Sequence, residues 1–397
     1  MAQFLEAQSL ALQNVKVTEK KEIIDIENAL NRVVAQDIVC IKDLPTYDNS
    51  AMDGYAFKYV DKNKDLKVVA TIMAGGIQEA ILKEGECYKI MTGAKVPSDV
   101  DTIAQREICE EPNGIMHLTS DVKQGNAIRL KGEEQKRGSV LVEKGEILTG
   151  AKIALLATQG ITKVEVYKKL SIAIVSTGNE LKEPHEVASE DEVYNINAIN
   201  IKMLLKNYNL DAEYLGSIPD DLEQVVEFIS KLKEYDLIIT TGGISKGDAD
   251  FTKQAFVQNG LKELFHGIKV KPGHPTMMGT MGSSFVMAMP GNPLAAIVNI
   301  ILLSMPIIFK MQGVKNFYYD SITVKNGEEL KLKPGRVNIV LGNLVNGKFI
   351  AYKNNKYGSG MITPLVESSY IAMFNKDADL VEQGASVDII KLYSLPS

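Results

Sequence analysis

The chain has 397 residues, of which 45% are hydrophobic and 24% are charged, and its formal net charge is −6. A single hydrophobic core stops growing at about 250–300 residues, so we expect about two to four domains. The composition is that of a globular protein. The acidic balance argues against non-specific nucleic-acid binding, because no basic excess is available to displace counterions. An acidic protein that binds an anion must concentrate its cations locally.

The cysteines and the apolar runs indicate where in the cell the protein is located. The three cysteines fit no CxxC or Cys/His metal spacing, which predicts idle thiols in a reducing compartment. Residues 1–6 lack the basic and apolar regions of a signal peptide. The most apolar run, 294–309, contains Asn299, Ser304 and Pro306 and is shorter than the roughly 20 residues that cross a bilayer. We therefore predict a cytoplasmic protein without a membrane span, in which this run is a buried helix.

The first part of the chain changes its pattern twice. Apolar residues fall near helical spacing from Leu5 to Leu12 and from Ile23 to Val33, so residues 1–45 are predicted to be helical. From 46 to 134, short apolar runs alternate with glycines, which predicts a small β-rich unit. Residues 135–168 are mixed, and a helix is predicted over 152–158.

Strands and helices alternate from about 170 to 312. This alternation predicts an open, doubly wound parallel sheet with helices on both faces. The predicted strands are 170–175, 212–218, 237–239 and 285–289, and the predicted helices are 196–204 and 222–232, the second with Asp220 or Asp221 as its N-cap. Ligands bind such sheets at the carboxyl ends of the strands.

The last part, residues 313–397, holds strand-like pieces and little helix. The pieces are 322–324, 337–341, 349–352 and 387–393. They predict a terminal β-barrel. The whole chain is therefore an α/β multidomain protein.

Two glycine-containing motifs follow predicted strands of the sheet. In Ser176–Leu181, Gly178 permits a close turn and Glu180 brings a carboxylate to it, although a solvated glutamate in a plain turn would look the same. In Thr240–Phe251, the glycines can form a concavity of N–H donors that binds an anion, and the aspartates can hold a divalent cation. Asp250 could equally be only the cap of the next helix. The spacing is not that of a Walker loop.

Further motifs place cations beside turns. Lys269–Pro275 joins two lysines and a histidine to a rigid turn, and suggests a bound anion unless these are ordinary surface lysines. Pro290–Pro293 is a tight turn before a helix whose N-terminus can face an anion. Met91–Ala94 and Arg129–Glu134 lie in the β-rich unit. Arg129 suits bidentate phosphate contacts, or it forms a surface ion pair of little consequence.

The loop Leu44–Phe57 is too irregular for a buried strand and too apolar for a linker. It carries Asp48 and Asp53 among proline, asparagine and glycine, which is typical of functional loops and also of ordinary Asx turns. No nucleophile can be assigned from the sequence, which has four histidines. Metal-assisted chemistry on a bound phosphate ester is therefore favoured over covalent catalysis.

These motifs, in this order, resemble the molybdenum insertases, the MoeA and gephyrin E-domain family. The strongest is Pro-x-x-Asp-Asn-Ser-Ala-Met-Asp-Gly-Tyr-Ala in residues 45–56, and the others named above follow in family order. The resemblance implies an elongated helical domain (1–45 and 135–168) with a small inserted β domain (46–134). It also implies a doubly wound α/β molybdopterin-binding domain (169–312) and a C-terminal β-barrel domain (313–397). Family members are dimers with sites shared between subunits.

The resemblance also implies an activity. The family takes adenylylated molybdopterin, cleaves its phosphoanhydride with a divalent cation, here expected to be Mg²⁺, and inserts molybdenum from molybdate, releasing AMP. Molybdopterin adenylyltransferase is the expected substrate donor. The implied catalytic residues are Asp53, Thr92, Glu180, Asp220 and Asp250, of which Glu180, Asp220 and Asp250 match metal-linked positions. The implied substrate-binding residues are Arg129, Glu134, Gly242, Gly243, Ser245, Asp248, Lys269, Lys271, Pro272, His274, Pro275, Asn292, Arg336 and Ser359.

Three positions depart from the family pattern. The usual Lys-Pro-Gly-Lys-Pro has His274 in place of its second lysine, and a lysine commonly found four residues before the Lys-Pro-Gly is Gly267. An expected aspartate is Glu134. The first two departures remove positive charge near the expected molybdate. Two alternatives stay open: a molybdopterin adenylyltransferase, which lacks the flanking domains, and a catalytically silent scaffold, which would have no need of the acidic motif residues.

Overall fold

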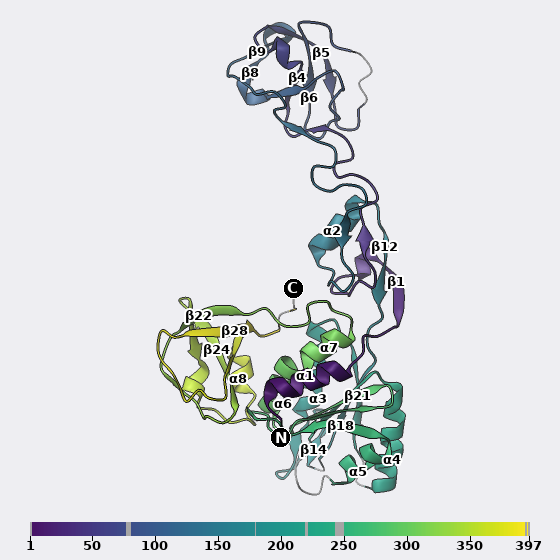
Figure 1. The fold of residues 1–397 in the computed structure, drawn as a ribbon, viewed down its shortest axis with the longest axis vertical. Coiled ribbons are helices and arrows are strands. Elements are labelled where there is room, and N and C mark those ends of the chain that lie inside the picture. Colours follow the sequence, from purple (N-terminus) through teal and green to yellow (C-terminus); the bar gives the residue numbers. More distant parts are fainter. Residues whose placement is uncertain are drawn as a thin grey trace. The chain divides into compact units, whose positions relative to one another are not determined.

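The computed structural model describes residues 2–76, 81–178, 180–218, 221–242, 250–393 and 395. The chain forms two compact units. The first comprises Met1–Gln36, Lys144–Thr149 and Lys163–Ser397, and the second comprises Asp37–Glu143 and Gly150–Thr162. Figure 1 gives the element labels used below.

A six-stranded sheet forms the centre of the first unit, in the order β16-β13-β17-β21-β20-β18. Four neighbouring strands are parallel, as the sequence predicts: β16 (Ala212–Ser217), β13 (Ile172–Ser176), β17 (Leu237–Thr241) and β21 (Ser284–Met289). Two antiparallel strands, β20 (Met277–Met281) and β18 (Leu261–His266), extend one edge. Met281 pairs with Ser284 across a two-residue turn, and so short a connection can join only antiparallel strands.

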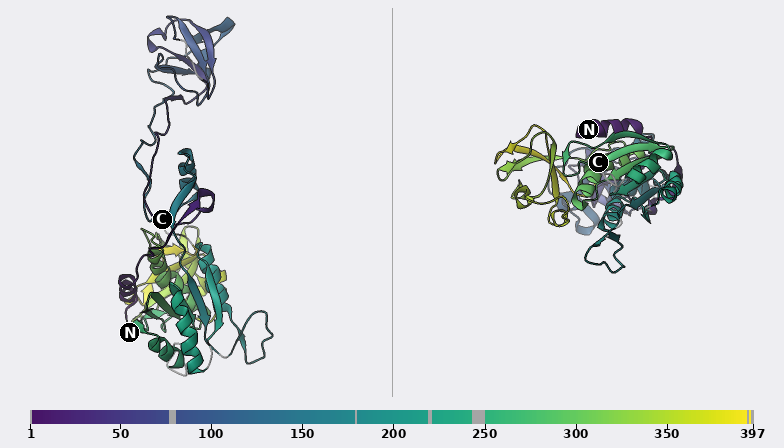
Figure 2. Two further views of the ribbon diagram at one scale, coloured as in Figure 1. Left: turned by 90° about the vertical axis from the view of Figure 1, so that its right-hand side faces the viewer. Right: turned by 90° about the horizontal axis from the view of Figure 1, so that it is seen from below.

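Helices cover both faces of this sheet (Figures 1 and 2). Ile172 and Ile174 of β13 enter one apolar core, and Ala173 and Val175 enter another, because successive strand residues point to opposite faces. The first core is completed by α1 (Phe4–Asn14), α3 (Ile196–Asn207), α6 (Pro293–Asn299) and α7 (Met305–Met311). The second is completed by α4 (Leu222–Lys231) and α5 (Asp250–Gln258). Asp221 caps α4 by accepting the Gln224 N–H at 3.1 Å.

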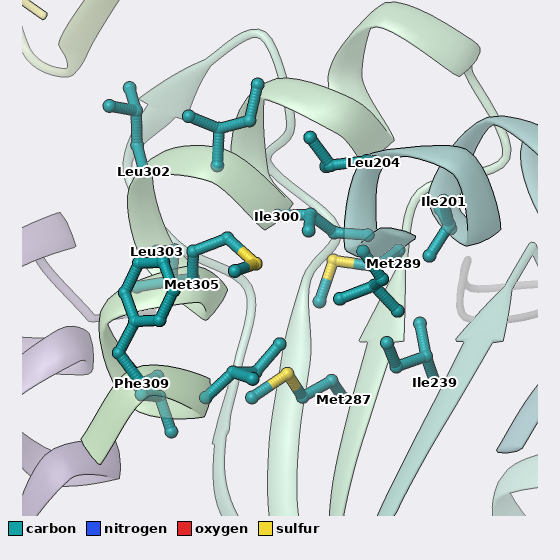
Figure 3. Packing of buried hydrophobic residues seen from close by; sticks show 14 of the residues in the cluster. Ile201, Leu204, Ile239, Met287, Met289, Ile300, Leu302, Leu303, Met305 and Phe309 are labelled. Carbon is teal, nitrogen blue, oxygen red and sulfur yellow. The ribbon is translucent and has the colours of Figure 1, made fainter. Parts of the chain in front are cut away.

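The apolar run near residue 300 is a core helix, as predicted. Helices α6 and α7 are joined through a π-helical turn, η6 (Ile300–Ser304). Among the described helices, the stretch Pro293–Met311 is long and apolar enough to cross a membrane, but 94% of its most apolar window is buried inside the protein. Ile300 and Leu303 belong to the same buried cluster as Met287 and Met289 of the sheet, and Figure 3 shows Ile300 beside Met289. The apolar side chains of this helical stretch are therefore buried in the protein core.

The C-terminal part is a closed β-barrel, as predicted. The barrel strands are β22 (Ile322–Asn326), β24 (Val337–Val345), β25 (Lys348–Ala351), β26 (Tyr370–Phe374) and β28 (Ser386–Lys391). They pair in the order β24-β25-β22-β28-β26, and β26 returns to β24. A shorter pair, β23 (Leu330–Lys331) and β27 (Leu380–Val381), and helix α8 (Thr363–Val366) complete it. Strand β19 (Val270–Lys271), from the α/β part, pairs with β24 and so joins the two.

The second unit is mainly a six-stranded sheet in the order β7-β4-β6-β5-β9-β8. The bounds are β4 (Gly54–Phe57), β5 (Leu66–Ile72), β6 (Glu86–Ile90), β7 (Thr102–Gln105), β8 (Cys109–Glu110) and β9 (Ile115–Leu118). The same unit holds helix α2 (Gly150–Thr158) and the pairs β2 (Ile38–Val39) with β11 (Val140–Val142) and β3 (Asn49–Ser50) with β10 (Ile128–Arg129). The β-rich character and the helix near 152–158 agree with the sequence prediction.

One predicted helix is wrong. Residues Lys21–Asp25 form strand β1, followed by the 3₁₀ turn η1 (Ile26–Asn28). Strand β1 pairs along its length with β12 (Lys163–Tyr167), whose Val164 and Val166 favour a sheet. Pairing with a segment about 140 residues away therefore overrides the helical spacing around Ile23. Helix α1 is confirmed within the same stretch. The predicted domain boundaries stay predictions.

Candidate functional site

Three strands of the α/β sheet end side by side and bring three predicted motifs together. In register, Ser176 lies beside Thr241, and Thr241 lies beside Met289. The Thr177 N–H donates to the Thr241 carbonyl at 2.9 Å, and the Gly242 N–H donates to the Met289 carbonyl at 3.1 Å. Gly242 has φ +82°, and a Cβ there would lie 2.6 Å from the Thr177 carbonyl oxygen. Only glycine fits at position 242, because the backbones of the two motifs come into close contact there.

Glu180 is exposed at this edge, just beyond Gly178. Its carboxylate folds back over that glycine, whose Cβ would lie 2.7 Å from one carboxylate oxygen. The Glu180 carbonyl accepts the Val193 N–H at 2.9 Å, next to the short parallel pair β14 (Leu181–Lys182) and β15 (Val193–Tyr194). The backbone that carries Glu180 is therefore tied to the end of the same loop.

A polar network fastens that loop to the sheet. The Asn195 amide donates to Ser176 Oγ at 2.9 Å and to Tyr214 Oη at 2.8 Å. Tyr214 donates to Glu183 Oε1 at 2.6 Å. Burial and this bond to a carboxylate raise the pKa of Tyr214, so the tyrosine stays a hydrogen-bond donor at neutral pH. Ser176 is the last residue of β13, so the network connects the Glu180 loop to the strand end.

The barrel contributes a loop to the same part of the first unit. Asn292 Nδ2 donates to Ser359 Oγ at 3.1 Å, which joins two residues predicted for the site. The Leu294 N–H, in the first turn of α6, donates to the Ser359 carbonyl at 3.1 Å. The barrel loop therefore takes up a donor at this helix N-terminus, and the expectation that the N-terminus faces an anion stays a prediction. The Ser359 loop is placed by the helix start and its preceding turn.

A cluster of three cations, Lys271, Lys333 and Arg336, lies where β19 meets the barrel. Lys271 pairs with Asn338 in the strand register. Burial, and then the positive charges of Lys333 and Arg336, lower the pKa of Lys271. A half-buried lysine held near two other cations is stabilised by an anion. Lys271 and Arg336 were predicted, whereas Lys333 was missed although it lies in the same Lys-Pro-Gly-Arg segment.

The loop that presents Lys271 is closed by its own hydrogen bonds. His274 Nδ1 donates to the Ile268 carbonyl at 2.8 Å, and the His274 carbonyl accepts the N–H groups of Ile268 at 3.0 Å and Thr276 at 2.9 Å. The carbonyl partner requires a proton on Nδ1, which leaves Nε2 of the exposed imidazole for another partner. Lys269, Pro272 and Pro275 are partly buried in the same loop.

In the second unit, Asp53 and Thr92 are in direct contact. Asp53 Oδ1 accepts the Thr92 N–H at 2.8 Å and the Thr92 hydroxyl at 2.7 Å. These two bonds, the backbone one first, lower the pKa of Asp53. The Gly93 N–H donates to the Ser50 carbonyl at 2.8 Å. The loop Leu44–Phe57 and the Met91–Ala94 turn therefore form one structure with a fixed carboxylate.

The Arg129–Glu134 segment also contacts this loop. Arg129 lies beside Asn49 in the β3–β10 register, the Lys131 N–H donates to Asp48 Oδ1 at 2.7 Å, and the Glu134 N–H donates to the Leu44 carbonyl at 3.0 Å. Arg129 itself is exposed and lies 3.9 Å from the exposed Glu133, an ion pair worth little. Its guanidinium therefore remains accessible to a ligand.

Part of the predicted site lies outside the described residues. Asp220, Gly243, Ser245, Asp248 and the side chain of Asp250 fall there, and Asp250 begins α5. Among the described residues, no group of three or more His, Cys, Asp or Glu side chains could hold a metal ion. Of the three expected magnesium ligands only the Glu180 side chain is described, so the described residues by themselves do not form a magnesium site.

The Asp53–Thr92 contact predicts a pH effect. Thr92→Val removes the hydroxyl donor, one of the two bonds that lower the pKa of Asp53, so that pKa should rise. If the Asp53 carboxylate serves activity, the acidic limb of the rate profile should move to higher pH in Thr92→Val. Initial rates over a pH series, with Thr119→Val as the control, measure this shift. An unchanged acidic limb would show that ionised Asp53 is not required.

The geometry defines a multidomain α/β protein in which strand ends, a loop with two lysines and a barrel lie in one unit. Family models agree: "MoeA N-terminal region (domain I and II)" matches residues 2–160, "Probable molybdopterin binding domain" matches 173–310, and "MoeA C-terminal region (domain IV)" matches 323–392.

Individual proteins extend the match over nearly the whole chain. A molybdopterin molybdenumtransferase of Haemophilus influenzae is 31% identical over 395 residues, 97% of each chain. One from Staphylococcus epidermidis is 32% identical over 77% of this chain and 74% of its own. The crystal structure of the molybdopterin biosynthesis MoeA protein from Pyrococcus horikoshii OT3 superposes with a TM-score of 0.86 at 27% identity, covering 98% of this chain and 100% of that one. The chain belongs to the MoeA family of molybdopterin molybdenumtransferases.

Proposed function

We propose that this protein is a molybdopterin molybdenumtransferase, an enzyme that inserts molybdenum during molybdenum cofactor biosynthesis. In the reaction, molybdenum passes from molybdate to adenylylated molybdopterin and AMP is released. One observation carries the proposal: Lys271, Lys333 and Arg336 gather in an otherwise acidic chain, and burial, followed by the charges of Lys333 and Arg336, lowers the pKa of Lys271. Molybdate is a dianion and would offset that repulsion.

Each group of site residues has a proposed role that follows from its chemistry. The cations Lys271, Lys333 and Arg336 hold the oxyanion, and Lys269 lies in the same loop. Gly242, together with Gly243, Ser245 and Asp248 of the same motif, binds the phosphates of the adenylylated substrate. Glu180, with Asp220 and Asp250, supplies carboxylates beside the phosphoanhydride. In the second unit, Asp53 and Thr92 act with Arg129 and Glu134 on the substrate. Asn292 and Ser359 hold the barrel loop at this edge.

Magnesium belongs to this proposal as the cofactor. It would be held by Glu180, Asp220 and Asp250 and would neutralise phosphate charge when bound. No other step described for this chain's residues depends on it.

The test is a direct assay of AMP release. The purified full-length protein is mixed with adenylylated molybdopterin, molybdate and Mg²⁺, and AMP is measured with and without each component. Molybdate-dependent release of AMP is expected. Consumption of ATP with molybdopterin would instead identify a molybdopterin adenylyltransferase. Absence of both reactions in folded protein would identify a silent scaffold and refute the proposal.

His274 gives this proposal a test within the lysine loop. If Nε2 of the exposed imidazole faces molybdate, His274→Ala should raise the apparent KM for molybdate, and His274→Lys, which places a permanent positive charge there, should lower it. An unchanged KM in both variants would make His274 only a loop residue, with Lys269 and Lys271 carrying the anion.

The protein works as a homodimer in the cytoplasm, and a molybdopterin adenylyltransferase supplies its substrate. Support comes from the dimeric assembly that the family resemblance implies and from the burial of the apolar helix Pro293–Met311. A stable, fully active monomer in sedimentation at micromolar concentration would contradict the dimer.

A further inference from the structure

We propose that Asn299 is a positioning residue for the anion-binding loop. Its buried side-chain amide fixes the Lys-Pro-Gly turn, and this keeps Lys271 beside Lys333 and Arg336. The inference rests on the proposed function, in which this loop binds molybdate. Asn299 would act through the loop and would not touch the anion.

The contacts of Asn299 all go to this turn. Asn299 is the last residue of α6 and is completely buried. Its Nδ2 donates to the Gly273 carbonyl at 2.7 Å and to Thr276 Oγ1 at 2.6 Å. Thr276 Oγ1 donates in turn to the Gly273 carbonyl at 2.9 Å. The amide group therefore donates both of its hydrogens to residues of the loop. These two bonds attach the turn to the end of helix α6.

The orientation of the amide follows from its partner. A carbonyl can only accept, so the NH₂ group must face Gly273, and Asn299 Oδ1 is left buried without a partner among the described residues. An unpartnered buried oxygen costs stability. An apolar side chain of similar size would avoid that cost. The net effect of the asparagine is thus local: it fixes the turn and does not strengthen the core.

Gly273 shows how closely the helix and the loop approach. Its φ is +106°, a region that side chains disfavour, and a Cβ at this position would overlap the Asn299 amide. The loop can adopt this conformation only with glycine at position 273, next to the Asn299 amide. The amide and the glycine together form one fixed contact between the core and the turn.

Fixing the turn matters for charge placement. From Gly273 the chain runs through Pro272 to Lys271, and β19 pairs with β24 over only Val270 and Lys271. The turn is therefore a principal restraint on where the Lys271 ammonium lies. Its interaction with a bound anion, and its repulsion from Lys333 and Arg336, both vary with distance. A small displacement of the loop should weaken anion binding while leaving the remaining site intact.

The test compares two equivalent buried amides. Asn299→Asp keeps the size but offers at most one donor in place of two. The apparent KM for molybdate should rise about tenfold, while kcat at saturating molybdate and KM for adenylylated molybdopterin stay within about twofold. Direct titration of the full-length protein with molybdate should show the same loss of affinity.

Asn326 is the matched control. It is 1% exposed, its Nδ2 donates to the carbonyls of Glu328, Val381 and Glu382, and its Oδ1 also lacks a partner among the described residues. Asn326→Asp should lower the melting temperature in the same way and leave the KM for molybdate unchanged. If the substitutions acted only by lowering stability, Asn299→Asp and Asn326→Asp would change the KM for molybdate alike. Such a result would contradict the positioning role.

Thr276→Val provides a second variant should Asn299→Asp fail to fold. It removes the hydroxyl's bond to the Gly273 carbonyl and the acceptor of one Asn299 amide hydrogen, but it keeps the Asn299 bond to Gly273, so a smaller rise in KM for molybdate is expected. An unchanged KM in the folded variants, together with a raised KM in Lys271→Ala, would refute the positioning role alone. An unchanged KM in Lys271→Ala would refute the proposed anion site and the positioning role with it.

Discussion

Replacing Glu180 with glutamine should lower the rate of AMP release by about one to three orders of magnitude, or roughly 1.4–4 kcal/mol of transition-state stabilisation. The substitution keeps the shape of the side chain and removes its charge at the sheet edge, where the carboxylate lies over Gly178. A carboxylate at a phosphoanhydride acts through that charge, either on a divalent cation or on a proton. The effect should fall on kcat, measured as AMP released per enzyme.

The matched control is Glu190→Gln, which removes a charge from an exposed residue of the same loop. It should keep the wild-type rate. Both variants should keep the wild-type circular dichroism and melting temperature, because Glu180 is exposed. Wild-type AMP release by Glu180→Gln would remove Glu180 from the catalytic residues. Equal losses in both variants would point to the overall charge of the loop.

The placement of the strand-end motifs was predictable because it follows from one geometric rule. Carboxyl ends of neighbouring parallel strands meet at the same edge. Ser176 and Thr241 are far apart in sequence, and the register places them side by side. Glycines after strands mark sites of close backbone approach, as Gly242 shows beside Thr177. These features need only local pattern and sheet topology.

Other features depend on contacts between distant elements, which local pattern does not encode. The bond from Asn292 to Ser359 exists because a barrel loop docks at the start of α6. Strand β1 forms because β12 is there to pair with it, although its apolar spacing is nearly helical. Asn299 is a polar residue within an apolar run of the sequence. Its bond to the Gly273 carbonyl exists because the fold brings that loop onto the end of α6.

The two units carry different kinds of predicted site residues. In the first unit, cations gather at the join between β19 and the barrel, and Glu180 is held at the strand ends. In the second, Asp53 is fixed by two donors from Thr92, and Arg129 is exposed. An oxyanion and the phosphates of an anhydride are both stabilised by cations, whereas a carboxylate beside the anhydride acts through a bound cation or a proton. The chain offers both cations and carboxylates.

Replacing Lys271 with alanine should raise the apparent KM for molybdate by roughly 10- to 150-fold. A hydrogen bond to a charged group contributes about 1.5–3 kcal/mol, and each 1.4 kcal/mol is about tenfold in affinity. Lys333 and Arg336 would remain, so binding should weaken without vanishing. Lys348→Ala removes an exposed charge from the barrel and is the control. Molybdate titrations and KM measurements at two salt concentrations should show a weaker salt dependence in Lys271→Ala.

The lowered pKa of Lys271 adds a second readout with a defined sign. A lysine whose pKa is lowered loses its proton at a lower pH than an ordinary lysine, so wild-type affinity for molybdate should fall toward alkaline pH. Bound molybdate favours the charged form, so binding in that range should be accompanied by proton uptake. Lys271→Arg keeps its charge there and should bind molybdate with little change on the alkaline side. If Lys271→Ala and the wild type share the same KM and the same alkaline profile, the anion is bound elsewhere and the cluster has no part in molybdate recognition.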